Sequence, residues 1–499
     1  MPRAAPARAV PEGVRTITRH LRRAVVAAAV AGTCAALLPA ALLPAAGAAS
    51  AAAPRPAPRI ERVSVASDGT RADAESHGAS LSADGRTVVF LSRAGTLAPG
   101  AGPAGHVFVR DLRTGRTELI SAASDGTPAD SWSSSPSISG DGRYVVFDSG
   151  ADLAPGSNPA GSDVFVRDRR TGRTEVLVAN RTGGSGSNHS AAISTTGRYV
   201  AFVSGRDDLV PGDTNQREDV FVLDRRSGTT QRVSVTSDGT QADGMSGYPV
   251  ISADGSRIGF RTAARNLAPE TAGKPGSRRP AADLARPGLY GFYVHDLRTG
   301  RTERAAETHD GLQALVTGGT GLSPDGRYAL FSSPEQVVAD DTNGAQDVYA
   351  KDLQTGTTRR LSLAADGSQA DGASYGGAAM SVDNERVFFA SDAGNLVPGD
   401  TNDRQDVFVR NLRTGAVERL NVATDGTQDD GNAGEVRTDL LGRTAVFNSW
   451  GCNWSPATPT ARATCSSGGS AETATGPHPR QEVRPGLVSR IPYPVSRIP

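Results

Sequence analysis

The chain has 499 residues, including 58 Gly and 31 Pro, and its 21% charged and 37% hydrophobic residues lie in the range of folded proteins, which excludes wholesale disorder. Lys plus Arg equals Asp plus Glu at 53 each, but residues 1–48 contain six Arg and one Glu, so the remainder has 47 basic and 52 acidic residues. The resulting balance of −5 gives no electrostatic reason to expect nucleic acid as a partner.

Residues 1–48 have the features of a signal peptide. Arginines precede a long apolar run, and the small residues around Ala48 and Ala51 suit a signal peptidase. A retained membrane anchor is the alternative, because the run is long enough to span a bilayer, but two prolines within it favour cleavage. We therefore expect a secreted or cell-envelope protein without a stable membrane span after cleavage, and an Ala/Pro-rich linker over residues 49–59.

From Ile60 onward the sequence repeats. The best preserved copy, residues 396–431, reads LVPGDTNDRQDVFVRNLRTGAVERLNVATDGTQDDG, which predicts a loop, a strand, a tight turn, a second strand and another loop. A Gly or Asn in the first turn of each unit gives the count, because this turn needs a positive φ. These residues are Gly85, Gly142, Gly197, Gly255, Gly326, Asn384 and Gly442. One longer interval contains a polar, Pro-rich insertion around residues 271–287, which we interpret as a loop.

Between the turns lie nearly continuous runs of β-branched and aromatic residues, such as RYVVF and RVFFA. Such runs are typical of strands that are covered on both faces, and helical periodicity is absent after residue 50. Four-stranded antiparallel units that recur at this spacing and are arranged radially are the blades of a β-propeller, whose closed ring removes most exposed strand edges. The sequence therefore predicts an all-β fold with a β-propeller over residues 60–449.

The motifs SxDGRYVAF and DVFVRDLRTG resemble the WD-repeat-like blades of TolB-type β-propellers, in particular exported bacterial repeats with GDTN loops. The resemblance covers roughly residues 60–449. It implies the propeller fold. The N-terminal α/β domain of TolB has no counterpart in residues 1–59, so the resemblance does not extend to TolB's role in an envelope-spanning complex.

The number of blades depends on how the ring closes. Six units are complete, from His77 to about Ala423, and the following EVRTDLLGRTAVFNS supplies two strands of a further unit. Residues 60–66 supply its outer strand from the other end of the chain. Because no DVFVRD-like sequence follows Ser449, we expect its third strand to be missing. We predict seven blades with a degenerate last blade, with six blades as the alternative, and a mostly irregular Pro/Arg-rich tail over residues 450–499.

The cysteines are few. Cys34 lies in the expected signal segment, so only Cys452 and Cys465 remain after cleavage. Two cysteines with twelve residues between them in an exported chain predict a disulfide, and there are no further cysteines to form a metal cluster.

Three of the longer loops carry the motif DTNxxxD. Its carboxylate, amide and carboxylate at positions 1, 3 and 7 resemble the first half of a calcium loop, although the Glu that an EF-hand has at position 12 is absent. Two interpretations therefore stand: calcium as a cofactor, or Asp and Asn as caps of tight turns, which is their commoner role. The residues are Asp213, Asn215, Asp219, Asp341, Asn343, Asp347, Asp400, Asn402 and Asp406.

The links between units carry a second array of paired aspartates. We interpret these as turn caps, because an acid/base pair needs two different environments and a repeated motif is ill suited to provide them. The pairs are Asp68 and Asp73, Asp125 and Asp130, Asp238 and Asp243, Asp366 and Asp371, and Asp425 and Asp430.

Two histidines and one serine are further candidates. His77 and His189 occupy matched positions where an inner strand enters the ring, so we consider them candidate ligand residues at a pocket mouth, with a chance pair of loop residues as the alternative. Ser374 in GASYG fits the GxSxG pattern of a nucleophile, but no helix follows it and we do not expect catalysis there.

No coherent catalytic set emerges from these motifs. The main hypothesis is an exported, monomeric, non-catalytic β-propeller that binds a protein or a cell-wall or envelope component through its loop-bearing face. The alternative is a polysaccharide hydrolase or lyase with its site in the central funnel. Histidines that share a ligand would favour the alternative, whereas funnel walls of Gly, Ser and Ala would count against it.

Overall fold

The computed structural model describes residues 59–158, 161–180, 187–268, 291–423, 425–451 and 487–490. The chain divides into two compact units, Met1–Pro54 and Arg55–Pro499, and every described residue belongs to the second. Outside the described residues lie the predicted signal peptide, all of the linker except its last residue, the insertion around residues 271–287, and both Cys452 and Cys465. Within the described ranges, no helix has the length and hydropathy needed to cross a membrane.

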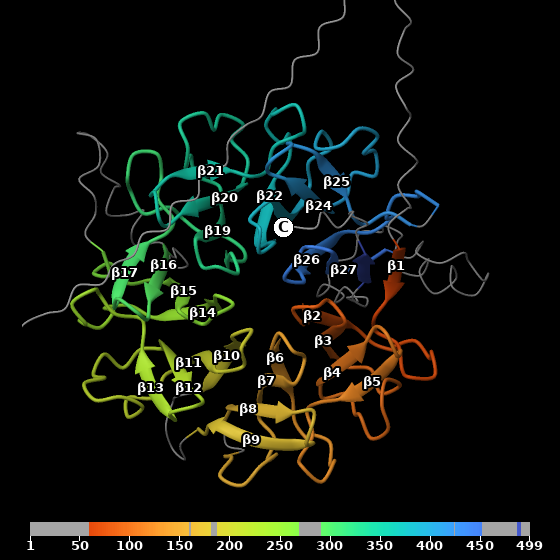
Figure 1. Cartoon of the computed structure of the whole chain (residues 1–499), viewed down its shortest axis with the longest axis vertical. Helices are drawn as coiled ribbons and strands as arrows, with labels where there is room; N and C mark the ends of the chain where they lie inside the picture. Colours follow the sequence, from red (N-terminus) through yellow and green to blue (C-terminus); the bar gives the residue numbers. More distant parts are fainter. Residues whose placement is uncertain are drawn as a thin grey trace, which may run out of the picture. The chain divides into compact units, whose positions relative to one another are not determined.

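The described strands form seven four-stranded antiparallel sheets arranged in a ring (Figure 1), so the fold is an all-β propeller. Six sheets, which we call blades 1 to 6, are each built from one continuous stretch of chain. Blade 1 contains β2 (Ser76–Leu81), β3 (Thr87–Ser92), β4 (His106–Asp111) and β5 (Arg116–Leu119); blade 2 contains β6 (Ser133–Ile138), β7 (Tyr144–Ser149), β8 (Asp163–Asp168) and β9 (Arg173–Val178); blade 3 contains β10 (Asn188–Ile193), β11 (Tyr199–Ser204), β12 (Asp219–Asp224) and β13 (Thr229–Arg232).

Blades 4 to 6 follow the same order, from an inner strand to an outer one. Blade 4 contains β14 (Ser246–Ile251), β15 (Arg257–Thr262), β16 (Gly291–Asp296) and β17 (Arg301–Arg304); blade 5 contains β18 (Gly321–Leu322), β19 (Tyr328–Ser333), β20 (Asp347–Asp352) and β21 (Thr358–Arg360); blade 6 contains β22 (Ser374–Met380), β23 (Arg386–Ser391), β24 (Asp406–Asn411) and β25 (Val417–Arg419).

The seventh sheet, which we call the composite blade, joins both ends of the described chain. Its strand order is β26 (Ala433–Thr438), β27 (Thr444–Ser449), β28 (Leu487–Arg490) and β1 (Arg59–Arg62), with β28 paired antiparallel to both β27 and β1. The expectation that this blade lacks a third strand is therefore wrong. A short segment of the tail takes that place, with Leu487 and Val488 at the positions of Phe165 and Val166 in blade 2.

The core lies between neighbouring blades because each sheet is covered on both faces. Along β7, Val145 and Phe147 pack with residues of blade 1, whereas Val146 packs with residues of blade 3. This alternation follows from the two-residue period of a strand. Phe147 also stacks on Phe165 of β8, with ring centroids 5.7 Å apart, and stacked aromatic pairs recur at the same place in the other five continuous blades.

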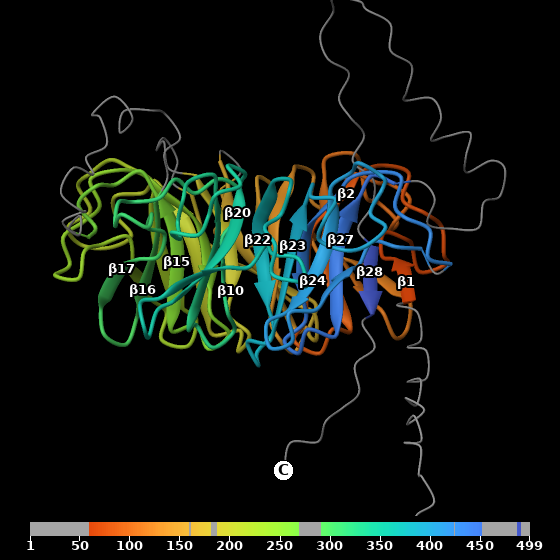
Figure 2. The same cartoon turned by 90° about the horizontal axis from the view of Figure 1, so that it is seen from above.

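Two kinds of connection occupy opposite faces of the ring (Figure 2). The loop-bearing face carries the long loops between second and third strands together with the links between blades. These are hydrogen bonded to each other, as in the 3.0 Å bond from Asn215 Nδ2 to the carbonyl of Ala242. The turn face carries the short turns between first and second strands. Asn384, which replaces Gly in one of these turns, has a φ of 57°, as the repeat pattern predicted.

On the turn face, backbone hydrogen bonds connect successive blades around the ring. Ala83 N–H donates to Gly140, Gly140 to Thr195, Thr195 to Ala253, and Ala253 to Pro324, at 2.9 to 3.0 Å.

The remaining part of this ring of bonds closes through the composite blade. The N–H of Val382 donates to Leu440 at 2.8 Å, and that of Leu440 donates to Ala83 at 3.2 Å. The series has one gap, between blades 5 and 6, because Pro324 has no N–H to donate. The inner ends of the blades are thereby fixed to each other at the turn face.

Candidate functional site

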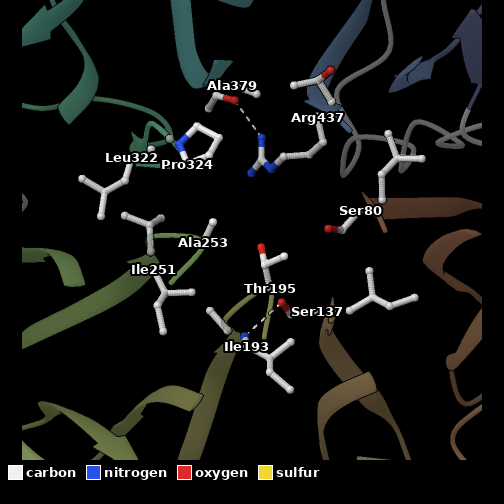
Figure 3. Close-up of a pocket in the computed structure, with 18 of the residues that line it drawn as sticks. Ser80, Ser137, Ile193, Thr195, Ile251, Ala253, Leu322, Pro324, Ala379 and Arg437 are labelled. Carbon is white, nitrogen blue, oxygen red and sulfur yellow. Dashed lines mark hydrogen bonds between the residues drawn. The ribbon is translucent and has the colours of Figure 1, made fainter. Parts of the chain in front are cut away.

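A central channel runs through the ring between the two faces, lined by the seven inner strands. Its volume is about 810 Å³, and its walls are mostly Gly, Ser, Ala, Thr and small aliphatic residues (Figure 3). The last residue but one of each inner strand is, in ring order, Ser80, Ser137, Ala192, Val250, Gly321, Ala379 and Arg437. Walls of this kind meet the criterion that counts against catalysis in the funnel.

Each inner strand except β18 contains a β-bulge near the loop-bearing face, where the register shifts against the second strand. Four of the bulges place a residue other than Gly at positive φ: Ser135 at 48°, Ser190 at 56°, Tyr248 at 52° and Glu435 at 52°. Such a backbone costs of order 1 kcal/mol at each position. The bulges turn these side chains toward the channel, which they all line.

Large apolar side chains are exposed beside this end of the channel. Trp132, Met245 and Tyr248 have exposed fractions of 45%, 41% and 61%, and they belong to the entry regions of β6 and β14. The inner strand β10 lies between β6 and β14 in the ring, so the three side chains flank one arc of the rim. Among the described residues, the two other large exposed apolar side chains, Val382 and Leu441, lie in turns on the turn face.

The two predicted histidines are not brought together. His77 in β2 and His189 in β10 belong to blades 1 and 3, and the residues that line the channel are their chain neighbours Gly78 and Ser190. No hydrogen bond joins the two histidines in the described part of the chain. The hypothesis that they share a ligand at the pocket mouth therefore stays without structural support.

His189 instead forms a different arrangement. Its Nδ1 lies 3.0 Å from Ser190 Oγ, and its Nε2 lies 3.3 Å from Glu218 Oε1. The hydrogen bond that His189 donates to Glu218 raises the pKa of His189, whereas burial lowers it. If Nε2 carries the proton, Nδ1 can accept the proton of the Ser190 hydroxyl, which is the relation between base and nucleophile in a hydrolase.

A buried carboxylate supports the same bulge from behind. Asp148 of β7 is fully buried, and it accepts hydrogen bonds from the backbone N–H groups of Ser190 at 2.8 Å and Ala191 at 3.4 Å. Burial raises the pKa of Asp148 to about 6. These two N–H groups are therefore engaged and do not face the channel as donors for an oxyanion.

The carboxylates of the channel wall are also engaged. Glu435 accepts from Gly78 N–H at 3.3 Å and from the Asn448 amide, while Asp439 accepts from the N–H groups of Arg443 and Thr444 at 2.7 and 2.8 Å. Glycoside hydrolysis usually needs one carboxyl group as acid and a second as base or nucleophile. Hydrogen bonds that hold both carboxylates against the protein backbone leave them poorly placed for these roles.

In each DTN loop an arginine occupies the place that the calcium hypothesis gave to an ion. Arg360 Nη1 lies 3.0 Å from Asp341 Oδ1 and 3.3 Å from Asp347 Oδ2, and Asn343 Nδ2 donates to Asp347 at 2.9 Å. The three charged side chains are 6% exposed or less. We call this arrangement of one arginine and two aspartates the arginine clamp.

The clamp recurs in the other two DTN loops. In blade 3 Arg232 lies 2.8 Å from Asp213 and 3.5 Å from Asp219, and Asn215 donates to Asp219. In blade 6 Arg419 lies 2.7 Å from Asp400 and 3.0 Å from Asp406, and Asn402 donates to Asp406.

The residues at the clamp position vary together along the chain. Blades 1 and 2, whose loops lack the DTN motif, have Leu119 and Val176 where blades 3, 5 and 6 have the arginine. Blade 4 is an exception, because it has Arg304 at this position without a DTN motif. Because the carboxylates are already paired with a guanidinium, they fit a calcium ion poorly. Within the described residues, no group of three or more His, Cys, Asp or Glu side chains is placed to hold a metal ion. Calcium binding therefore stays a prediction, and the geometry argues for a structural role of these residues.

The first aspartate of each link pair caps its turn, as predicted, whereas the second members Asp73, Asp243 and Asp371 accept hydrogen bonds from the loop between the second and third strands. The first member of each pair accepts a hydrogen bond from the N–H two residues further on, as from Thr70 to Asp68 at 2.9 Å and from Thr127 to Asp125 at 2.9 Å. These backbone hydrogen bonds lower the pKa of Asp68 and Asp125. Ser374 is fully buried, and its hydroxyl lies 2.9 Å from that of Ser391, so the GASYG motif is structural.

No protein-family model matches the sequence, and no curated protein matches it either. The fold is nevertheless similar to several solved structures. Oligogalacturonate lyase from Vibrio parahaemolyticus is 12% identical, with 87% of this chain and 97% of that chain covered and a TM-score of 0.48. A putative TolB from Agrobacterium tumefaciens is 16% identical, with 62% and 86% covered and a TM-score of 0.34. The acylaminoacyl peptidase of Pyrococcus horikoshii is 12% identical, with 73% and 47% covered and a TM-score of 0.40.

TolB proteins are thus among the solved structures to which this chain is similar, in keeping with the resemblance of its repeat motifs. Similarities at this level of identity concern the fold alone. The assignment of a propeller rests on the seven sheets themselves, and the function has to be argued from the residues of this chain.

Sequence reasoning missed one residue of the channel. Arg437 of β26 stands at a position where the six other inner strands have Ser, Ala, Val or Gly, and its guanidinium points into the channel (Figure 3). An alignment of EVRTDLLGR with the other inner strands would have shown this exception. The clamp arginines also have a signal, because each follows the first Asp of its DTN loop by 19 residues.

Proposed function

We propose that this protein is an exported, non-catalytic binding module that holds a protein or cell-envelope ligand against the rim of its loop-bearing face. The observation that carries the proposal is the arc formed by Trp132, Met245 and Tyr248, all of which are more than 40% exposed. Exposed aromatic and methionine side chains grouped around a concave opening are typical of binding surfaces. Small channel walls and engaged carboxylates support binding over catalysis.

The test compares two faces of the same ring. The double variant Trp132→Ala/Tyr248→Ala removes the rim aromatics, and Val382→Ala/Leu441→Ala removes exposed apolar side chains from the turn face. Cosedimentation with isolated cell-envelope fragments is expected to fall at least about tenfold for the rim variant and to stay unchanged for the turn-face variant. Equal binding by both variants and the unmodified protein would contradict the proposal.

A second candidate function is favoured by the contacts of His189 with Ser190 and Glu218. In this reading Ser190 is the nucleophile and His189 the base of an ester or amide hydrolase at the channel mouth. It ranks second because the N–H groups of Ser190 and Ala191 donate to Asp148 rather than to a reacting oxygen. Hydrolysis of chromogenic esters that is lost in Ser190→Ala but kept in Ser135→Ala, the matched bulge serine of blade 2, would establish it; no hydrolysis would exclude it for this substrate class.

A further inference from the structure

Arg437 is the sole cation among the described residues that line the channel. Its side chain lies in the channel, which the seven inner strands surround, and the equivalent residues of the other inner strands have small side chains. In the described structure, no carboxylate lies within ion-pair distance of its guanidinium. The nearby Glu435 accepts hydrogen bonds from Asn448 and Gly78. Asp439 accepts hydrogen bonds from backbone N–H groups of the adjoining turn.

The hydrogen bonds of Arg437 leave one edge of the guanidinium for a ligand. Nη1 donates to the carbonyls of Gly377 at 2.8 Å and Val436 at 3.0 Å. These bonds fix the side chain across the channel, and among the described residues neither Nε nor Nη2 has a hydrogen-bond acceptor. The edge formed by Nε and Nη2 carries two parallel N–H donors, which is the geometry that takes a carboxylate by two hydrogen bonds.

Other polar groups converge on the same space. Figure 3 shows the hydroxyls of Ser80, from β2, and Thr195, from the turn after β10, directed into the channel opposite Arg437. Burial among the channel walls lowers the pKa of Arg437 from its ordinary value, and the negative charge of Glu435 opposes this shift only in part.

We propose that the channel is a binding site for a carboxylate group, held by the free edge of Arg437 and assisted by the hydroxyls of Ser80 and Thr195. The ligand is a singly charged group, because one guanidinium edge with two donors matches one carboxylate. Glu435 and Asp439 add negative charge to the same wall and disfavour a phosphate dianion. This site lies inside the ring and does not depend on the rim proposed above.

The test uses small anions and the purified protein. Thermal unfolding and calorimetric titration compare sodium acetate and sodium succinate with sodium chloride at equal ionic strength, and sodium phosphate forms a further arm. A ligand that binds the folded ring raises its unfolding temperature by mass action. Carboxylates are expected to raise this temperature above the value in chloride, and phosphate is expected to act more weakly.

Three variants test whether Arg437 is the residue that binds the carboxylate. Arg437→Gln is expected to lower the affinity for succinate at least about tenfold, because charge-assisted hydrogen bonds are lost. Arg437→Lys should keep part of the affinity and is the second variant if Arg437→Gln fails to fold. Arg443→Gln, an exposed arginine of the same blade, changes the net charge equally and should bind as the unmodified protein does.

Two results would overturn the proposal. One is an equal response to carboxylates and chloride in the unmodified protein, and the other is an undiminished carboxylate effect in Arg437→Gln. A stronger response to phosphate than to succinate would contradict the ligand class. None of these results bears on the rim variants, so the two proposals fail separately.

Discussion

Arg360 and Asp341, which are 19 residues apart in the chain, form a buried ion pair of 3.0 Å at the outer edge of blade 5. The same guanidinium also contacts Asp347, so one positive charge serves two carboxylates that are almost fully buried. Removal of the arginine would leave both negative charges without the cation that they share, in contact with neutral donors such as Tyr349 and Asn343.

We therefore predict that Arg360→Ala lowers the free energy of unfolding by about 3–5 kcal/mol. Arg359→Ala, on the exposed side of the same strand, removes only an exposed cation–π contact with Tyr328 and should change it by less than about 1 kcal/mol. Urea denaturation followed by tryptophan fluorescence and circular dichroism measures both values. A loss below about 1 kcal/mol for Arg360→Ala would show that the clamp is not a stabilising element.

Calcium should have little effect on the folded ring, because an arginine already contacts both carboxylates of each DTN loop. Unfolding temperatures in EDTA and in millimolar calcium are expected to agree within about one degree. A clear upward shift in calcium that Asp341→Ala or Asp400→Ala abolishes would instead establish the DTN loops as metal sites. This comparison separates the two interpretations of the DTN motif directly.

The pKa values of two groups of aspartates are shifted in opposite directions from the ordinary value. Hydrogen bonds from an arginine of the turn face lower the pKa to about 2 at the end of three third strands, in the pairs Arg143–Asp168, Arg198–Asp224 and Arg327–Asp352. Burial raises the pKa of Asp148 to about 6 and that of Asp429 to about 7. An unfolded aspartate has a pKa of about 3.9.

These shifts predict a stability maximum near pH 4. Between pH 7 and 4 the folded state binds protons at Asp148 and Asp429 that the unfolded chain does not, so stability rises as the pH falls. Below about pH 4 the unfolded chain takes up protons while the arginine-paired carboxylates stay ionised down to about pH 2, so stability falls. Urea denaturation at pH 7, 4 and 2.5 measures the profile.

Two variants test which aspartates cause the rise and the fall of stability with pH. Asp148→Asn should flatten the rise between pH 7 and 4, and Asp224→Asn should flatten the fall below pH 4. A maximum near pH 7 would show that the buried carboxylates remain ionised in the folded protein.

The composite blade predicts the effect of truncation. A chain that ends at residue 451 lacks β28, which pairs with both β27 and β1. We expect such a chain to lose β1 from the ring, to expose the edge of β27 and to unfold at a lower temperature. A chain that lacks only residues 491–499 should unfold as the full chain does. Limited proteolysis reads out the release of β1, and an unchanged unfolding temperature after removal of β28 would contradict its role.

The repeat determined most of the fold because its signals are local. Turn residues at positive φ, including Asn384, and runs of apolar residues that alternate between two cores are readable without tertiary information. The third strand of the composite blade was not readable in this way. Strand β28 is short, differs from the other third strands in sequence and depends on partners from both ends of the described chain.

The candidate site was less predictable because its contacts cross between blades. His189 and Ser190 are adjacent in sequence, but their partners Glu218 and Asp148 come from a loop of the same blade and from the neighbouring blade. The motif DTN resembled a calcium loop, and the structure places an arginine from further along the chain against its carboxylates. The constant spacing of 19 residues between the first Asp of a DTN motif and an arginine would have indicated this ion pair.

The composite blade also sets the order in which the chain can become compact during synthesis. Val446 of β27 belongs to the same core as Phe90 of blade 1, whereas Phe447 belongs to the core of Phe388 in blade 6. Both cores stay incomplete until β27 leaves the ribosome. Before that point a nascent chain exposes two apolar surfaces, on blades 1 and 6, that are far apart in sequence. Their closure is a late, long-range step, and interrupted synthesis at this point would yield a product prone to aggregation.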